Sequence, residues 1–478
     1  MCPVQRLHGD YDKVFTMRAT VCPAAAERIK TDDVSIVHAR DFVKSGSGTR
    51  LDPWVGADGA GGIRDAIASV PTGKVRVLCA AGFFEVSSVL KIRADAEVFG
   101  AGMNDTTLLH TPFTTYSSFG SLEAGCTLAN LTVDGNRWDP TASDLCVGGI
   151  ALQGPGISVQ RVRAKNFACA AFSPSRGSDD LEITDCVSID SHYFVWAEAT
   201  CGYAGHRYLR NSIATTRSDA KNRSNAFELD NGNADGLLNC TAPATAAERH
   251  ARRNIVAGNR ITNFIWQGIA IARMHGFEVS DNLILAGELS LPGGNGIHVE
   301  HNSGDINISG NTVTQPRSEP IWIAASANVS VVGNTVAMAN CTKDCVQVCT
   351  QPHRQAVPEG HPDPLDNGIR IVGNTLSGCR SGVNVWGNGT PGLVDVAIEG
   401  NEIARSWEAA VSVGSARGIA VRDNQISGAP VPVRVTAGAE QLAVEGNTFR
   451  GCASCKVDYV QPLTPRAQVA NNTCNEFH

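Results

Sequence analysis

A short sequence unit recurs along the second half of the chain: Gly or Asp, then Asn, a variable residue and an apolar residue. Its Asn residues are Asn259, Asn282, Asn311, Asn334, Asn374, Asn401, Asn424 and Asn447, spaced by 23, 29, 23, 40, 27, 23 and 23 residues. A unit of about 23 residues cannot close a hydrophobic core by itself. Each unit must therefore bury its apolar residues against the next unit, as in a solenoid.

The segments between these Asn units alternate apolar and variable residues, as in Ile269/Ile271, Ile321/Ile323 and Val411/Val413. Alternation with a period of two predicts strands rather than helices. Leucine-rich repeats have a similar period but require a Leu framework that this sequence lacks. We therefore predict an all-β protein, a right-handed parallel β-helix, with each Asn in a left-handed bend and its amide hydrogen-bonded along the stack.

The composition agrees with one long repeat architecture. The chain has 478 residues and 48 Gly, with 42% hydrophobic and 18% charged residues, so ample apolar side chains are available for a core. We expect residues 1–40 to form an N-terminal extension and residues 41–478 to form a single parallel β-helix domain. No apolar run reaches the 18 to 20 residues of a membrane span, and the first 20 residues lack the apolar region of a signal peptide.

The beginning of the predicted domain resembles the opening segment of the pectate-lyase-like β-helix superfamily. The resemblance is carried by Gly46–Thr49, Asp52–Trp54, Gly62–Ile67, Lys74–Val86 and Val98–Gly102. It extends over roughly residues 40 to 475 and implies a short N-terminal helix that caps the first coil. The superfamily includes polysaccharide lyases, uronan epimerases, glycoside hydrolases and phage adhesins, so the resemblance implies a fold and not a reaction.

Polar residues at outward-facing strand positions predict a catalytic site. Glu228 and Asp230 flank the inward Leu229, and His298 and Glu300 flank an inward Val two strands further on. Equivalent positions in neighbouring coils are about 4.8 Å apart, so the two acidic pairs should be about 9.6 Å apart. Our candidate catalytic residues are His298, Glu300, Asp230 and Glu228, provided that the register holds, because a one-residue slip would turn them all inward.

Cationic and aromatic residues nearby predict substrate contacts. Arg273 and His301 follow their strands directly, Trp322 offers a flat face for a sugar ring, and Arg252 and Arg253 lie in a loop that should overhang the same region. The stretch from residue 207 to residue 273 holds ten Lys/Arg and five Asp/Glu, a balance of +5, within a chain of net charge −7. This distribution favours an anionic ligand and argues against a general nucleic-acid binder.

We expect an enzyme that acts on an acidic, uronate-containing polysaccharide or oligosaccharide by β-elimination or epimerisation. Arg273, with Arg252 or Arg253, would neutralise the uronate carboxylate, His298 would be the base, and Glu300 would orient His298. Many such lyases use Ca²⁺, for which Glu228 and Asp230 would serve as ligands.

Two alternatives remain open at this stage. The first is an inverting glycoside hydrolase in which Asp230 and Glu300 lie near the upper limit of the usual carboxyl separation, about 6.5 to 9.5 Å. The second is a non-catalytic glycan-binding or surface protein. None of these interpretations predicts the oligomeric state.

The sixteen Cys and nine N-x-S/T sequons favour a secreted protein. In an oxidising compartment most of these Cys would be paired, and the sequons would accept glycans. An intracellular protein with buried free thiols is the alternative, because Cys also packs as a small apolar side chain.

Overall fold

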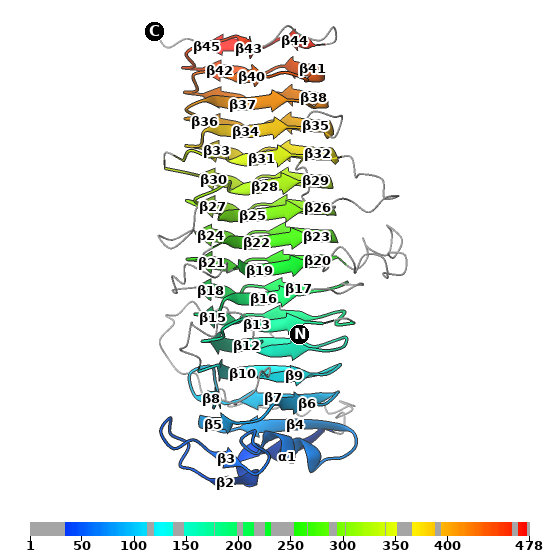
Figure 1. Cartoon of the computed structure of the whole chain (residues 1–478), viewed down its shortest axis with the longest axis vertical. Coiled ribbons are helices and arrows are strands. Elements are labelled where there is room, and N and C mark those ends of the chain that lie inside the picture. Colours follow the sequence, from blue (N-terminus) through cyan, green and yellow to red (C-terminus); the bar gives the residue numbers. More distant parts are fainter. Residues whose placement is uncertain are drawn as a thin grey trace, which may run out of the picture.

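The computed structural model describes residues 34–111, 119–136, 148–175, 177–197, 204–214, 225–230, 253–264, 266–285, 294–301, 303–339, 341–350, 366–387, 393–460 and 467–475. These residues form stacked coils that advance from the N-terminal helix to the C-terminal strands (Figure 1). One coil consists of β22 (Gln267–Ala272), β23 (His275–Ser280) and β24 (Leu283–Leu285), and β25 (Asn295–Glu300) begins the next. Each strand pairs in parallel with its equivalent one coil away. The predicted right-handed parallel β-helix is confirmed.

Two large parallel sheets form the walls of the described part of the solenoid, one of 29 strands and one of 14 strands. The 14-stranded sheet contributes one strand to each coil and carries the predicted site. Its strands are β6 (Leu90–Ile92), β9 (Gly120–Leu122), β11 (Ile150–Leu152), β13 (Ala170–Pro174), β16 (Tyr193–Ala197), β19 (Asn225–Asp230), β22, β25, β28 (Ile321–Ala324), β31 (Val346–Cys349), β34 (Ser381–Trp386), β37 (Ala409–Gly414), β40 (Val433–Val435) and β43 (Val457–Tyr459).

The core follows directly from the alternation seen in the sequence. The inward residues Ile269, Ile271, Ile321 and Ile323 are fully buried, and their counterparts in the other coils stack on them in continuous rows. Because each apolar row continues through successive coils, the solenoid has one hydrophobic core along its length.

The N-terminal end of the core is covered by the predicted capping helix, α1 (Ile63–Ala68). Its buried residues pack against β4 (Lys74–Cys79) and β6. Before the helix, β1 (Val34–His38) pairs with β4 and so adds a strand to the 29-stranded sheet. The domain boundary near residue 40 stays a prediction, since residues 1–33 lie outside the described part. No helix in the described ranges is long and apolar enough to cross a membrane.

The Asn residues of the repeat form a buried ladder at one corner of the coils. Each side-chain amide nitrogen donates to the side-chain oxygen of the Asn in the next coil, at 2.9 to 3.0 Å, and Asn211 and Asn472 extend the ladder at its two ends. The left-handed residue, however, is the one before each Asn, such as Gly258 (φ 65°) or Asp281 (φ 54°). Our assignment of the left-handed bend to Asn itself was wrong, because Asn is needed for its amide and the preceding residue makes the turn.

The cysteines are divided between disulfides and free thiols. Cys345 pairs with Cys379, and Cys455 pairs with Cys474. The described free thiols include Cys79, Cys126, Cys186, Cys341 and Cys452, and the first three of these are buried in the core. Among the described residues, therefore, the expected pairing holds for some cysteines, while others pack as small apolar side chains.

Candidate active site

The predicted outward residues lie in two rows across the 14-stranded sheet, in the register read from the sequence. Glu228 is aligned with Ala270, which is aligned with His298. Asp230 is aligned in the same way with Ala272 and then with Glu300. Both alanines are buried, so their short side chains form a low floor between the acidic residues of β19 and those of β25.

Glu228 is an acid that stays protonated to unusually high pH. Burial raises its pKa to about 7, an effect opposed by a hydrogen bond from the Asn225 amide and reinforced by the negative charges of Asp230 and Glu300. A carboxyl group with a pKa near 7 can donate a proton at neutral pH, which is the requirement for a general acid.

Asp230 is held by Arg273, which follows β22 at the corner of the coil. The guanidinium Nε donates to Asp230 Oδ1 at 2.9 Å, and its terminal nitrogen donates to the other carboxylate oxygen. The side chains of the pair are only 15% and 19% exposed. The guanidinium of Arg273 therefore forms a bidentate interaction with Asp230. This interaction competes with the expected binding of a uronate carboxylate by Arg273.

Glu300 lies between two histidines. Its Oε2 is 3.3 Å from His298 Nε2 and 3.2 Å from His301 Nε2. Burial would raise the pKa of Glu300, but its close contacts with the two imidazoles, and their positive charge whenever they are protonated, outweigh this effect and hold the pKa well below its usual range. Glu300 is therefore fully ionised at neutral pH, whereas Glu228, with a pKa of about 7, is only partly ionised.

His298 is buried beneath an aromatic ring. Its imidazole stacks on the indole of Trp322, with the ring centroids 4.3 Å apart and the planes inclined by 11°. The indole nitrogen of Trp322 donates to Cys349 Sγ at 3.0 Å. The face of Trp322 that covers His298 is thus unavailable to a sugar, and the ring acts in part as a wall that fixes the imidazole.

Three residues of this site were not predicted from the sequence. Trp196 on β16 is aligned with Glu228 and is stacked on Tyr193, with centroids 5.8 Å apart. The alternation around the inward Val195 could have identified it as an outward residue. Asn225 and Gln267, at the starts of β19 and β22, are buried and gave no comparable signal, because an amide at a strand end looks like a turn residue.

Two arginines, Arg252 and Arg253, are predicted to overhang the site. Arg252 lies outside the described residues. Arg253 directly precedes β20 (Asn254–Ala257), and no hydrogen bond or ion pair connects it with Glu228, Asp230 or Glu300 among the described side chains.

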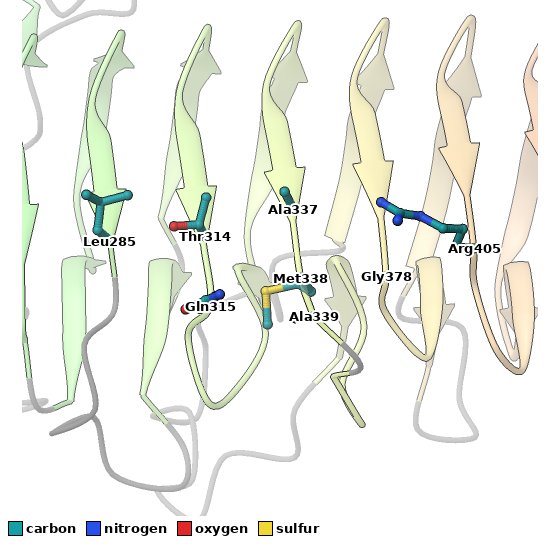
Figure 2. Close-up of a pocket in the computed structure, with 8 residues that line it drawn as sticks. All are labelled: Leu285, Thr314, Gln315, Ala337, Met338, Ala339, Gly378 and Arg405. Atoms are coloured by element: carbon teal, nitrogen blue, oxygen red, sulfur yellow. The ribbon is translucent and has the colours of Figure 1, made fainter.

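A groove of about 720 Å³ lies on a different part of the surface. It follows β24, β27 (Thr312–Thr314) and β30 (Thr335–Ala337), and Figure 2 shows its lining side chains on successive coils. They are Leu285, Thr314, Gln315, Ala337, Met338, Ala339, Gly378 and Arg405. These described lining residues include no carboxylate or imidazole, so they offer no acid–base pair for catalysis.

The residues considered for calcium do not suit that ion. Both oxygens of Asp230 bind Arg273, and Glu228 accepts a hydrogen bond from Asn225 and retains its proton to about pH 7. A Ca²⁺ ion prefers several ionised or carbonyl oxygens and would be repelled by the guanidinium. No group of three or more metal-ligating side chains occurs within the described ranges.

Comparison with known proteins identifies the architecture. The profile of the family described as "Right handed beta helix region" matches residues 175–336 and 365–477. No curated protein sequence matches the chain. Among solved structures, tailspike protein 3 of bacteriophage CBA120 is 13% identical with a TM-score of 0.55, and the similarity covers 91% of this chain and 61% of that one.

Two enzymes are among the other similar structures. The catalytic unit of the GH87 α-1,3-glucanase from Streptomyces thermodiastaticus is 16% identical (TM-score 0.46; 97% of this chain, 70% of that one). The A-module of the mannuronan C-5 epimerase AlgE6 from Azotobacter vinelandii is 15% identical (TM-score 0.41; 92% and 99%). At these identities the likeness concerns the fold alone.

Proposed function

The chain belongs to the right-handed β-helix family, and from this premise we propose that it is an enzyme that hydrolyses a glycosidic bond of a polysaccharide on the 14-stranded sheet. Glu228 is the general acid, and Asp230 is the general base. The observation that carries this proposal is the contrast within β19: a carboxyl group whose pKa is raised to about 7 and an ion-paired carboxylate lie two residues apart on the same face of the sheet.

The spacing of these groups suits hydrolysis with inversion. Two residues of a strand are separated by about 6.6 Å, and residues two strands apart by about 9.6 Å. Inverting hydrolases need about 6.5 to 9.5 Å between their carboxyl groups, so that a water molecule fits beside the sugar. The backbone spacing of Glu228 and Asp230 falls at the lower end of this range, and that of Asp230 and Glu300 falls at its upper limit.

The reaction transfers two protons. Glu228 gives its proton to the glycosidic oxygen as the bond between that oxygen and the anomeric carbon breaks. Asp230 takes a proton from water, whose oxygen forms the new bond to the anomeric carbon from the opposite side of the ring. Arg273 orients Asp230, and Glu300 with its two histidines supplies negative charge close to the positive charge that develops on the sugar.

An extended carbohydrate is the ligand class that best fits this surface. The 14-stranded sheet presents a long, regular face. Trp196 and Trp322 lie at the two ends of the row that runs through Glu228 and His298, four strand spacings apart. Four strand spacings correspond to about 19 Å, which is longer than one sugar ring. Indole rings stack on sugars through their apolar faces, and such contacts suit a polymer lying along the solenoid axis.

Elimination or epimerisation of a uronate is the second candidate, favoured by the +5 balance of residues 207–273 and by the adjacent His298 and Glu300. We place it second because Arg273 binds Asp230 instead of standing free for a substrate carboxylate. A third outcome, glycan binding without catalysis, would follow from binding without turnover.

The deciding experiment incubates the chain with neutral and uronate-containing polysaccharides and measures reducing ends and ultraviolet absorbance together. Hydrolysis should produce reducing ends without absorbance, whereas elimination would produce a conjugated double bond that absorbs. Asp230→Asn should abolish turnover. Asp458→Asn, on the same sheet at β43 and 48% exposed at its side chain, is the matched control and should retain it. Full activity of Asp230→Asn would refute the assigned base.

We also propose that the protein is secreted and glycosylated. The two disulfides support an oxidising compartment, and the sequon residues Asn104, Asn328 and Asn471 are exposed. Expression in a secreting eukaryotic host, followed by enzymatic deglycosylation, should lower the measured mass, and an unchanged mass would contradict the proposal.

A further inference from the structure

Two buried amides connect the candidate acid with the candidate imidazole. Asn225 and Gln267 are aligned with each other at the starts of β19 and β22, and they are only 4% and 6% exposed. Asn225 donates to Glu228, and Gln267 contacts Nδ1 of His298. The proposed hydrolysis gives neither amide a chemical step, so their burial needs another explanation.

A backbone group determines which way both amides point. The backbone N–H of Gln267 lies 2.8 Å from Asn225 Oδ1, and a backbone N–H can only donate. The amide nitrogen of Asn225 therefore points the other way, where it donates to Glu228 and, at 3.2 Å, to Gln267 Oε1. Because Gln267 turns its oxygen to Asn225, its nitrogen must face His298 Nδ1.

An amide NH₂ group donates and cannot accept, so Nδ1 of His298 must accept. We propose that Asn225 and Gln267 are positioning residues that hold neutral His298 as the tautomer with its proton on Nε2. Nε2 is buried and lies 3.3 Å from the Glu300 carboxylate, and it has no well-aligned hydrogen bond with any described residue. His298 thus presents an N–H group, not a lone pair, to Glu300 and the adjacent space.

This inference changes the role of His298 within the proposed function. An imidazole whose Nδ1 is occupied by Gln267 and whose Nε2 carries a proton is a hydrogen-bond donor, and it is not available as a base. The catalytic contribution of His298 is therefore to hold Glu300 or a substrate oxygen by donation. The role of His298 as a donor in catalysis rests on the proposed function. Its tautomer does not, because the tautomer follows from the hydrogen bonds of Asn225 and Gln267.

The tautomer can be measured by ¹⁵N NMR of histidine-labelled full-length protein, in which a protonated and an unprotonated ring nitrogen have distinct shifts. The His298 signals are identified among the 12 His by their loss in His298→Asn. At a pH where the ring is neutral, the wild type should show a protonated Nε2 and an unprotonated Nδ1. The reverse pattern in the wild type would overturn the proposal.

Two substitutions should move the proton to Nδ1. Gln267→Glu places an accepting carboxylate against Nδ1. Asn225→Asp leaves an acceptor for the Gln267 backbone N–H but removes the amide donor, so the Gln267 side chain should turn its nitrogen to the new carboxylate and its oxygen to His298. Gln347→Glu, two strands from His298 on the same face, is the matched control and should keep the proton on Nε2. If both Gln267→Glu and Asn225→Asp fold and their His298 ¹⁵N signals are unchanged, the proposed control of the tautomer by these two amides is contradicted.

A kinetic measurement separates this inference from the proposed function. If both hold, Gln267→Glu should lower kcat by about 10- to 100-fold with little change in KM, because the donor is lost while binding surfaces remain. A wild type that hydrolyses no polysaccharide would refute the proposed function and leave the NMR result standing. An active wild type whose His298 has its proton on Nδ1 would refute only the tautomer.

Discussion

Neighbouring side chains give the three acidic residues of the candidate site different electrostatic environments. Glu228 is buried beside an uncharged amide, Asp230 is bound by a guanidinium, and Glu300 lies between two imidazoles. The pKa of Glu228 is raised to about 7, whereas that of Glu300 is lowered. Environments that separate the protonation states of adjacent carboxyl groups are the usual basis for assigning acid and base.

Glu228→Gln should lower kcat by about 10² to 10⁴, the usual effect of losing a positioned general acid. In the wild type the acid must be protonated, so activity should fall as the pH rises through about 7. Any residual activity of Glu228→Gln should not show this fall between neutral and alkaline pH. An unaltered profile in Glu228→Gln would contradict its role as the acid.

The same substitution should stabilise the protein at alkaline pH. The pKa of Glu228 is about 7 in the folded state and 4.5 for the ordinary side chain, so the folded state binds more protons between these values. Stability therefore decreases across this window as the pH rises, and the cost persists above it. Urea unfolding should show Glu228→Gln gaining about 1 to 3 kcal/mol over the wild type at pH 8 and little at pH 4. Glu402→Gln, at an exposed position, should show no such difference.

At the scale of the strand and its turns, two kinds of contact connect neighbouring coils. The Asn ladder connects them at one corner, and the rows of inward apolar residues connect them within the 14-stranded sheet. Asn311 accepts from the backbone and side-chain nitrogens of Asn282 and donates to Asn334 and to the Val279 carbonyl. Each internal ladder residue thus hydrogen-bonds to buried amide and carbonyl groups of both neighbouring coils. This explains why Asn recurs at this position, although the preceding residue makes the turn.

Asn311→Leu should lower the free energy of unfolding by about 1 to 3 kcal/mol, because the neighbouring amides lose partners inside a buried stack. Asn472→Leu is the matched control at the end of the ladder, where the half-buried side chain bonds to one Asn of the described residues, whereas Asn311 bonds to two. Denaturant unfolding should find a smaller loss for Asn472→Leu. Equal losses would show that an internal position of the ladder contributes no more stability than its half-buried end.

Trp196→Ala tests the strand face as a polysaccharide platform. Its indole lies beside Glu228 without contributing a titratable group, so its removal should raise KM for a polymer about tenfold and leave kcat nearly unchanged. Trp407→Ala is the control, since this indole is 49% exposed outside the 14-stranded sheet and should not affect KM. A fall in kcat without a change in KM would assign Trp196 a different role.

At the scale of the whole molecule, the hydrophobic core contains both free thiols and a disulfide, and the two have different chemistry. Burial raises the pKa of Cys79 and Cys186 to about 12 and that of Cys126 to about 11, so these thiols stay protonated and unreactive. Cys345–Cys379 instead joins two coils covalently.

Thiol titration without reduction should therefore give different counts for the native and the unfolded protein. In denaturant at least the five free thiols named above should react, whereas Cys79, Cys126 and Cys186 should remain protected in the native state. The control is the same titration after reduction, which should approach the sixteen Cys of the chain. Fewer than five reactive thiols in denaturant would contradict the described pairing.

The repeat by itself determined the solenoid, its strands and the register of the 14-stranded sheet. Periodicity is a local property of the chain, and a single register places Ile269, Ile297 and Ile321 inward together. The same register put Glu228, Asp230, His298 and Glu300 on one face, as the sequence predicted. Only the tertiary structure decided what these side chains do to one another: that Arg273 binds Asp230, that Trp322 covers His298, and that Gln267 occupies Nδ1. These contacts join coils whose spacing in sequence varies with loop length, and they depend on rotamers and burial, which alternation along a strand does not specify.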